Sequence, residues 1–92
     1  MFIEKPAAAG TLESSDCLVT VEPAQGGIML EVDSVVLLQY GEEIRSTVME
    51  TLRSLEVQSA CVRVQDKGAL NCVIAARVEA AVLRSQFKGG RE

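Results

Sequence analysis

"CLVTVEPAQGGIMLEVD", residues 17–33, decides the predicted fold, because it holds two alternating runs around a turn. An apolar residue at every second position is typical of a strand with one buried face, so residues 17–22 and 28–33 are predicted strands. Between them, residues 23–27 include a proline and two adjacent glycines, which favour a turn. The stretch therefore predicts a β-hairpin.

After this hairpin, apolar residues recur at every third or fourth position instead of every second one. That spacing predicts an amphipathic helix over 35–54, with Asp33 or Ser34 as its cap. Four apolar residues of this helix are expected to be buried: Leu37, Ile44, Val48 and Leu52. Residues 59–65 alternate again and predict a third strand, parallel to its neighbour across the helix.

A second helix is predicted over 67–84, with Asp66 as its cap. Two apolar rows run along it, one of larger residues and one containing alanines. The first row would pack on the sheet, whereas the second would face either solvent or a partner. The rows are Leu70, Ile74, Val78 and Val82, and Val73, Ala76, Ala80 and Leu83, with Arg77 and Arg84 between them on one side.

Together these elements predict an α+β fold. We expect a small three-stranded mixed sheet, built from β-hairpin, helix, strand and helix, with the two helices packed on it. Residues 1–16 would form an N-terminal arm and loop, and residues 17–86 a single domain. Residues 87–92 would form a flexible tail.

Composition excludes several classes of function. The 92 residues carry a net charge of −4 and only 3% aromatic residues, without the basic cluster and stacking rings that nucleic-acid binding requires. No apolar run approaches the roughly 20 residues of a membrane span. Cys17, Cys61 and Cys72 are expected to be free thiols in a reducing cytoplasm, and their spacing predicts no metal site.

The segment Glu13-Ser14-Ser15-Asp16 places two serines between two carboxylates, just before the first predicted strand. A serine becomes a nucleophile only beside a base, and the chain has no histidine. Taken alone, Ser14 is a turn residue or a cap. The chain is therefore not expected to be catalytic by itself, and any chemistry at these serines needs a base from another protein.

Three segments carry a resemblance to a known family: "PAAAGTLESSD" (6–16), "YGEEIRSTV" (40–48) and "VQDKGALNCVIAARVEAAVLR" (64–84). The chain resembles the acyl carrier (gamma) subunit of bacterial citrate lyase from residue 6 to about residue 84. AGTLES and DKGAL are the specific parts. The family usually reads Glu-Ser-Gly-Asp in the first segment, and here Ser15 replaces the glycine.

The resemblance implies that Ser14 is the covalent attachment site of phosphoribosyl-dephospho-coenzyme A, bound through a phosphodiester. It implies a carrier of acetyl and citryl thioesters during cleavage of citrate to acetate and oxaloacetate. The implied partners are the alpha (acyl transferase) and beta (citryl lyase) subunits, a prosthetic-group transferase and an acetylating ligase. Glu13 and Asp16 would either contact that transferase and its cations, or keep the loop solvated.

Two alternatives stay open at this point. One is the related acyl carrier of malonate decarboxylase, which bears a similar group on a serine. The other is an α+β adaptor that binds partners through its second helix and carries no group. The AGTLES and DKGAL segments favour citrate lyase over the first alternative, and an intact-mass measurement would separate a carrier from an adaptor.

Overall fold

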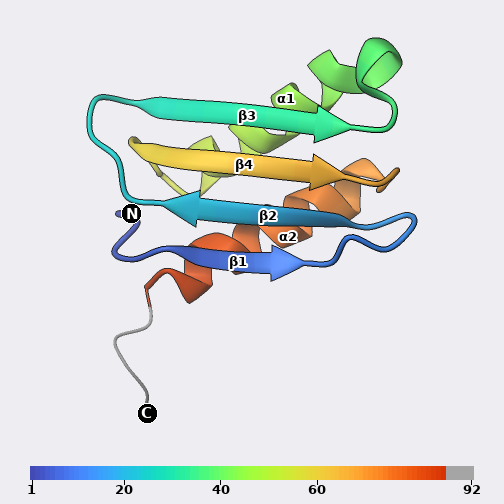
Figure 1. Ribbon diagram of the computed structural model, residues 1–92. Coiled ribbons are helices and arrows are strands. Elements are labelled where there is room, and N and C mark those ends of the chain that lie inside the picture. The colour runs from blue at the N-terminus through green and yellow to red at the C-terminus, as the bar shows by residue number, and fades with distance from the viewer. Residues whose placement is uncertain (87–92) are drawn as a thin grey trace.

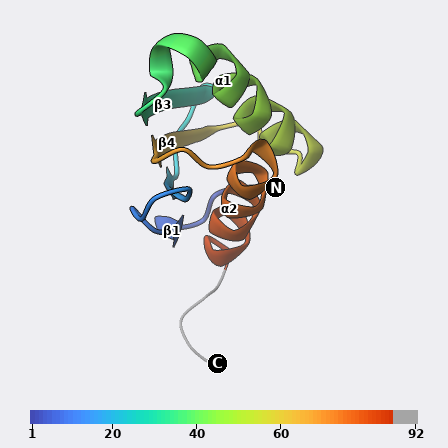
Figure 2. The ribbon, with the colours of Figure 1, turned by 90° about the vertical axis from the view of Figure 1, so that its right-hand side faces the viewer.

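The computed structural model describes residues 1–86 and has two layers, a sheet and a pair of helices. Figure 1 shows the sheet in front of the helices, and Figure 2 shows both helices against the same face of the sheet. The elements, in chain order, are β1 (Ala7–Gly10), β2 (Cys17–Glu22), β3 (Ile28–Ser34), α1 (Leu37–Ser54), β4 (Ala60–Asp66) and α2 (Asn71–Arg84). The predicted α+β class, with a mixed sheet and two helices, is confirmed.

The predicted hairpin between residues 17–22 and 28–33 is wrong. The strand order is β1-β2-β4-β3, so β4 lies between β2 and β3. It pairs antiparallel with β2, where Val64 faces Val19, and parallel with β3, where Val64 faces Val32. β4 buries every second residue, which suits a strand with a neighbour on each side. The five residues 23–27, which join β2 to β3, are long enough to pass across the one strand between them.

The sheet has four strands rather than the predicted three, because residues 7–10 form β1. This strand pairs antiparallel with β2, Ala9 opposite Val19, so the true hairpin is β1–β2. The sequence "AAAG" has no apolar-polar alternation, and its strand character comes from this pairing. Ala9 is buried on the face that the helices cover.

The core lies between that face and the two helices. Ile44, Val48 and Leu52 of α1 are buried as predicted, and so are three residues of the first row of α2, Ile74, Val78 and Val82. The prediction for Leu37 is wrong, since 44% of this residue is exposed. Leu37 is the first residue of α1, just after the connection from β3, and the buried residues of this helix begin only at Ile44.

The second helix begins at Asn71, four residues later than predicted, and Asp66 is not its cap. Gly68 has a φ of +94°, which a right-handed helix cannot contain. Asp66 instead ends β4, and its carboxylate accepts a hydrogen bond from the backbone N–H of Ala69 (2.9 Å). Ser34 accepts from the N–H of Val36 (3.1 Å) just before α1, without acting as that helix's cap.

Neither helix within residues 1–86 has the length and apolar character needed to cross a bilayer. The predicted tail, residues 87–92, lies outside the described residues.

Candidate functional site

Residues 11–16 join β1 to β2 and form the loop that contains both serines. In Figure 1 this loop lies at the right-hand end of the sheet. The N–H of Thr11 donates to the carbonyl of Cys17 (3.2 Å) at the base of the loop. At the tip, the N–H of Asp16 donates to the carbonyl of Glu13 (3.1 Å), closing a β-turn with Ser14 and Ser15 at its centre.

Ser15 has a φ of +65°, whereas Ser14 is not among the residues with positive φ. This sign pattern belongs to a type II turn, whose third position favours glycine. Glycine is the residue that the resembled family has at this position. Ser15 therefore adopts a backbone conformation that costs an L-residue about 1–2 kcal/mol.

Gly10 allows the two strands of the hairpin to close. Its φ is +107°, and a Cβ built on it would lie 1.9 Å from the carbonyl oxygen of Cys17. That distance is far shorter than any van der Waals contact. Only glycine fits at this position, so the "AG" before the loop is a steric requirement of the hairpin.

Asp16 anchors the loop to α2. Its carboxylate accepts two hydrogen bonds from Arg77, at 3.0 Å from Nε and 2.8 Å from Nη2. It also accepts from the Thr11 hydroxyl (2.7 Å) and from the N–H of Cys17 (2.7 Å). Donation by Arg77 first, then by Thr11 and Cys17, holds the pKa of Asp16 well below its ordinary value. The same pairing raises the pKa of Arg77.

The loop is also joined to the connection that follows β4. The N–H of Ser15 donates to the carbonyl of Lys67 (2.9 Å), and the N–H of Lys67 donates to the carbonyl of Asp16 (2.9 Å). The serine loop is thus held by its own turn, by α2 and by the end of β4. Its backbone is positioned by the fold rather than left free.

The side chains of Ser14 and Ser15 are outside this network, and only the backbone of Ser15 belongs to it. Ser14 is exposed, and its hydroxyl makes no hydrogen bond within residues 1–86. Glu13 is also exposed, and its N–H donates to the Thr11 hydroxyl (3.2 Å). The arrangement presents two unpartnered hydroxyls, those of Ser14 and Ser15, at the tip of an ordered turn, which suits modification by another protein.

The three thiols differ in their surroundings. Cys17 is fully buried at the start of β2, and burial together with the charges of Asp16 and Asp66 raises its pKa to about 11. Its thiolate is therefore not populated near neutral pH. Cys61 is half-buried and Cys72 is exposed, and all three are free. Among the described residues, no group of three Cys, Asp, Glu or His side chains could hold a metal ion.

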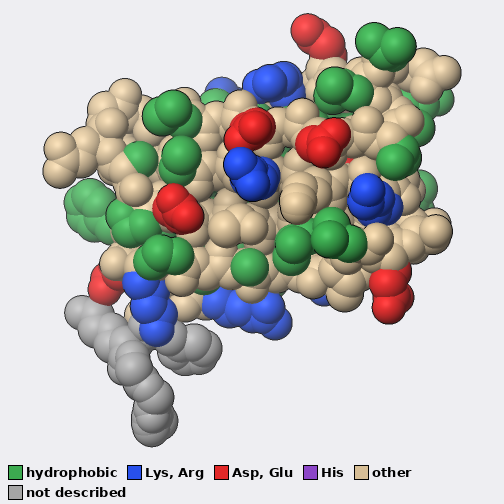
Figure 3. Space-filling view, in the orientation of Figure 1, with side chains coloured by type: hydrophobic (Ala, Val, Ile, Leu, Met, Phe, Trp, Pro, Cys, Tyr) green, Lys and Arg blue, Asp and Glu red, His purple; other side chains and the backbone are tan. Residues whose placement is uncertain are grey.

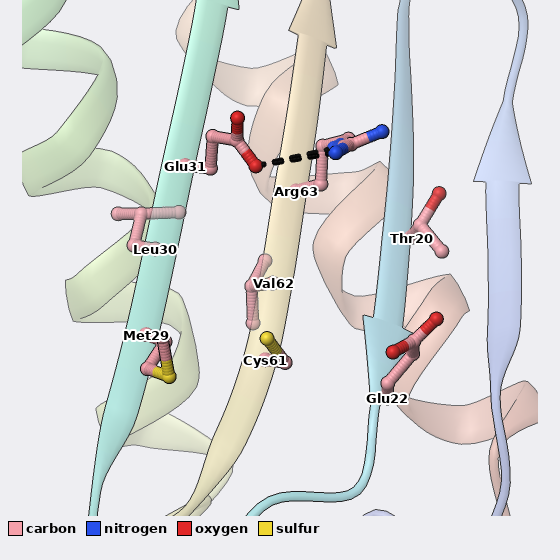
Figure 4. A pocket seen from close by; sticks show the side chains of 8 residues that line it. All are labelled: Thr20, Glu22, Met29, Leu30, Glu31, Cys61, Val62 and Arg63. Carbon is pink, nitrogen blue, oxygen red and sulfur yellow. Dashed lines mark hydrogen bonds and ion pairs between the residues drawn. The ribbon is translucent and has the colours of Figure 1, made fainter.

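Two hollows lie outside the loop. One, of about 460 Å³, lies on the uncovered face of the sheet and is lined by residues of β2, β3 and β4 (Figure 4). The other, of about 270 Å³, lies between α1 and the connection after β4. Only the second is close in the chain to the residues that hold the serine loop, since Asp66 and Gly68 line it and Lys67 lies between them.

Ser14 was proposed as the attachment site from the family resemblance, and the sequence did not predict which residues hold its loop. Arg77 was visible only as a charge between two apolar rows of a helix, and nothing in the sequence pairs it with Asp16, 61 positions earlier. Neither of the two roles proposed for Asp16 from the sequence included this pairing with Arg77. A useful signal was Gly10, since a glycine that closes a hairpin marks the start of a tight loop.

Comparison with known proteins places the chain in a family. The sequence profile described as malonate decarboxylase delta subunit (MdcD) matches residues 4–85. The chain is 55% identical to the citrate lyase acyl carrier protein of Clostridium perfringens, over 92% of this chain and 85% of the relative. The protein of that name from Fusobacterium nucleatum is 50% identical, over 92% of each chain.

A solved structure has the same fold at much lower identity. It is a crystal structure of a Pseudomonas malonate decarboxylase hetero-tetramer in complex with malonate, and one of its chains superposes with a TM-score of 0.78. That match has 22% identity and covers 92% of this chain and 88% of the other. On the identity and coverage of its curated relatives, this chain belongs to the citrate lyase acyl carrier protein family.

Proposed function

We propose that this chain is the acyl carrier subunit of a citrate lyase complex and that Ser14 holds its prosthetic group. The observation that carries the proposal is the tip of an anchored turn at which the Ser14 and Ser15 hydroxyls are exposed and unpartnered, and the family resemblance selects Ser14. A carrier needs its attachment point accessible to several enzymes and fixed in position relative to the folded domain. The serine loop meets both conditions.

The group implied by the family resemblance is phosphoribosyl-dephospho-coenzyme A, joined to Ser14 through a phosphodiester. The chemistry of the site fits this linkage, because a free hydroxyl is the acceptor that a phosphodiester requires. Bound there, the group would supply a thiol that carries acyl groups between enzyme active sites. The chain supplies the serine oxygen and a rigid loop, and its lack of histidine leaves the base for loading to the prosthetic-group transferase.

One of the chain's own thiols, Cys17, is excluded from the acyl chemistry. Burial keeps Cys17 protonated, so that it neither attacks nor accepts the acyl group. The family resemblance implies that the reacting thiol belongs to the prosthetic group, and tethering keeps its local concentration high at each partner's site. The partners in this proposal are the alpha transferase and beta lyase subunits, the loading transferase and an acetylating ligase, in the cytoplasm.

The malonate decarboxylase carrier is the second candidate function. The family profile that matches residues 4–85 and the solved structure both bear that name. Identity favours citrate lyase, at 50–55% against 22%. Reconstitution decides between them, since a loaded carrier should restore citrate cleavage to carrier-free lyase subunits and not malonate decarboxylation.

The attachment site is tested by mass spectrometry. Protein from its native host should carry one covalent adduct, and peptide mapping should locate it on Ser14. Ser14→Ala should fold normally, lose the adduct and leave the reconstituted complex inactive, whereas the matched variant Ser15→Ala should keep the adduct. An adduct on Ser15, or on a serine outside this loop, would contradict the assignment.

A further inference from the structure

Most of the large hydrophobic residues that are exposed lie at one end of the molecule. The β1–β2, β3–α1 and β4–α2 connections come together there, at the right of Figure 1 and facing the viewer in Figure 2. We call this set the end patch: Leu12, Val35, Leu37, Leu38, Tyr40 and Leu70. Leu38 is fully exposed and Leu70 is 71% exposed, so these side chains contribute little to the core.

The end patch is continuous with the serine loop. Leu12 belongs to that loop, and Leu70 belongs to the β4–α2 connection, whose Lys67 is hydrogen-bonded to Ser15. Asp66 links the remaining connection, because its carbonyl accepts from the N–H of Val35 (3.3 Å) and its carboxylate from the Ser34 hydroxyl (2.8 Å). A protein that contacts the group on Ser14 therefore approaches this end.

The patch borders the hollow of about 270 Å³, because two patch residues, Tyr40 and Leu70, line that hollow. Its wall is largely apolar, and its rim is polar, where Asn71 donates to the Glu43 carboxylate. The apolar lining residues are Val36, Tyr40, Ile44, Ala69 and Leu70. A hollow of this size accepts one large side chain of a partner, as hot-spot residues of protein interfaces do.

The uncovered face of the sheet differs from this end. Figure 3 shows acidic and basic side chains mixed with separate apolar ones across that face. The hollow there is lined by Glu22, by the Glu31–Arg63 ion pair and by exposed Met29 (Figure 4). Scattered apolar residues among charges are ordinary protein surface, whereas a grouped apolar set marks an interaction site.

We propose that the end patch is the surface through which the carrier binds a subunit of its lyase complex, which inserts an apolar side chain into the hollow and places basic residues beside Glu42 and Glu43, two exposed glutamates of α1. This rests on the proposed function. A permanent subunit interface is more apolar than a transient one, which favours a resident subunit over the loading transferase. A second copy of this chain would bring the same two glutamates together, and like charges disfavour that pairing.

The test uses the full chain with Ser14→Ala, so that no prosthetic group contributes to binding. Binding to purified transferase and lyase subunits from the same host is measured by calorimetry for the Ser14→Ala parent, for Leu38→Glu and for Leu70→Gln. The matched control is Met29→Glu, which places the same charge on the uncovered sheet face. Melting temperatures check that each variant is folded.

We expect Leu38→Glu to weaken binding to one of the subunits at least tenfold, Leu70→Gln to weaken it less, and Met29→Glu to leave it unchanged. Equal binding by Leu38→Glu and the parent would overturn the proposal, as would a loss confined to Met29→Glu. A dimer of the carrier that Leu38→Glu dissociates in sedimentation would assign the patch to a second copy instead. An effect of Leu38→Glu that appears only in carriers loaded on Ser14 would assign it to the prosthetic arm.

Failure of this inference is distinguishable from failure of the proposed function. A parent that binds the lyase subunits, with binding indifferent to Leu38, refutes only the end patch. A native chain that carries no adduct by intact mass and binds neither subunit refutes the carrier function itself.

Discussion

The two ion pairs within residues 1–86 have the same chemistry and different surroundings. Arg77–Asp16 joins α2 to the serine loop through two hydrogen bonds, with the side chains 36% and 15% exposed. Arg63–Glu31 joins β4 to β3 on the uncovered sheet face at 3.3 Å, with the side chains 61% and 71% exposed. The Asp16 carboxylate also accepts hydrogen bonds from the Thr11 hydroxyl and from the backbone N–H of Cys17, whereas the Glu31 carboxylate lies in solvent.

This difference indicates what each pair does. An exposed ion pair gains little, because water screens the charges and long side chains lose freedom. The Glu31–Arg63 pair joins strands whose backbones are already hydrogen-bonded, so its loss changes no geometry. The Asp16 carboxylate instead collects donors from the loop and from α2, which fixes the segment that carries Ser14. Arg77 therefore positions the serine loop through Asp16.

The largest expected effect comes from breaking the base of that loop. In Gly10→Ala the new methyl would lie 1.9 Å from the Cys17 carbonyl oxygen and 3.2 Å from Cδ of Arg77. Overpacking and backbone strain together should lower the free energy of unfolding by at least about 3 kcal/mol. Urea unfolding measures this change.

The control for this prediction is Gly26→Ala, in the β2–β3 connection. Gly26 also has a positive φ, +88°, but a Cβ there meets nothing within 4 Å. Strain alone should lower the free energy of unfolding by about 1–2 kcal/mol. Equal losses in the two variants would mean that the contact with Cys17 is not what restricts Gly10.

The next prediction concerns variants that each remove one of the two ion pairs. Their effect is measured as the change of stability with pH. Because the pKa of Asp16 is lowered in the folded chain from its ordinary 3.8, the folded state binds fewer protons there than the unfolded state. This contribution is therefore present above that value and is lost as pH falls from about 5 towards 2. Asp16→Asn should lower stability at pH 7 and flatten this acid-induced loss.

Glu31→Gln is the matched control, since it neutralises the other carboxylate. Its free energy of unfolding at pH 7 should stay within about 0.5 kcal/mol of the parent, with the acid-induced loss unchanged. Urea unfolding at several pH values between 3 and 7 measures all three proteins. A pH profile of Asp16→Asn that matches that of Glu31→Gln would refute the distinction between the pairs.

Much of this fold could be predicted from local patterns. Residues 17–22 alternate and Ile44, Val48 and Leu52 recur at helical spacing, and these elements formed where expected. Strand order could not be obtained in this way, because alternation gives which face of β2 is buried and not which strand lies beside it. The local turn signal of 23–27 therefore suggested a pairing that the apolar β4 prevents.

The candidate site divides in the same way. Ser14 was assigned from a sequence motif, and its role as attachment site stays a prediction. The contacts that hold its loop, Asp16 with Arg77 and Ser15 with Lys67, join residues that are distant in the chain and appear only after folding. Ser15 is an intermediate case, because it replaces the glycine of the resembled family and has a positive φ, +65°, in the structure.

The smallest expected effect comes from Ser15→Gly, which relieves backbone strain in the serine loop without removing any of the hydrogen bonds that hold it. Ser15 has a φ of +65°, which glycine adopts without strain. Ser15→Gly should raise the free energy of unfolding by up to about 1 kcal/mol, because relief of strain exceeds the added entropy of the unfolded chain. Glu56→Gly, at φ +60° after α1, is the matched control and should gain a similar amount.

Loading separates these two glycine variants. Ser15→Gly lies beside the proposed attachment serine and restores the residue that the resembled family has there, so the transferase should load it at least as fast as the parent. Glu56→Gly leaves the serine loop untouched and should load at the parental rate. Time courses of adduct formation by intact mass measure both rates. Slower loading of Ser15→Gly, with its stability raised, would mean that the transferase requires the Ser15 side chain rather than the shape of the turn.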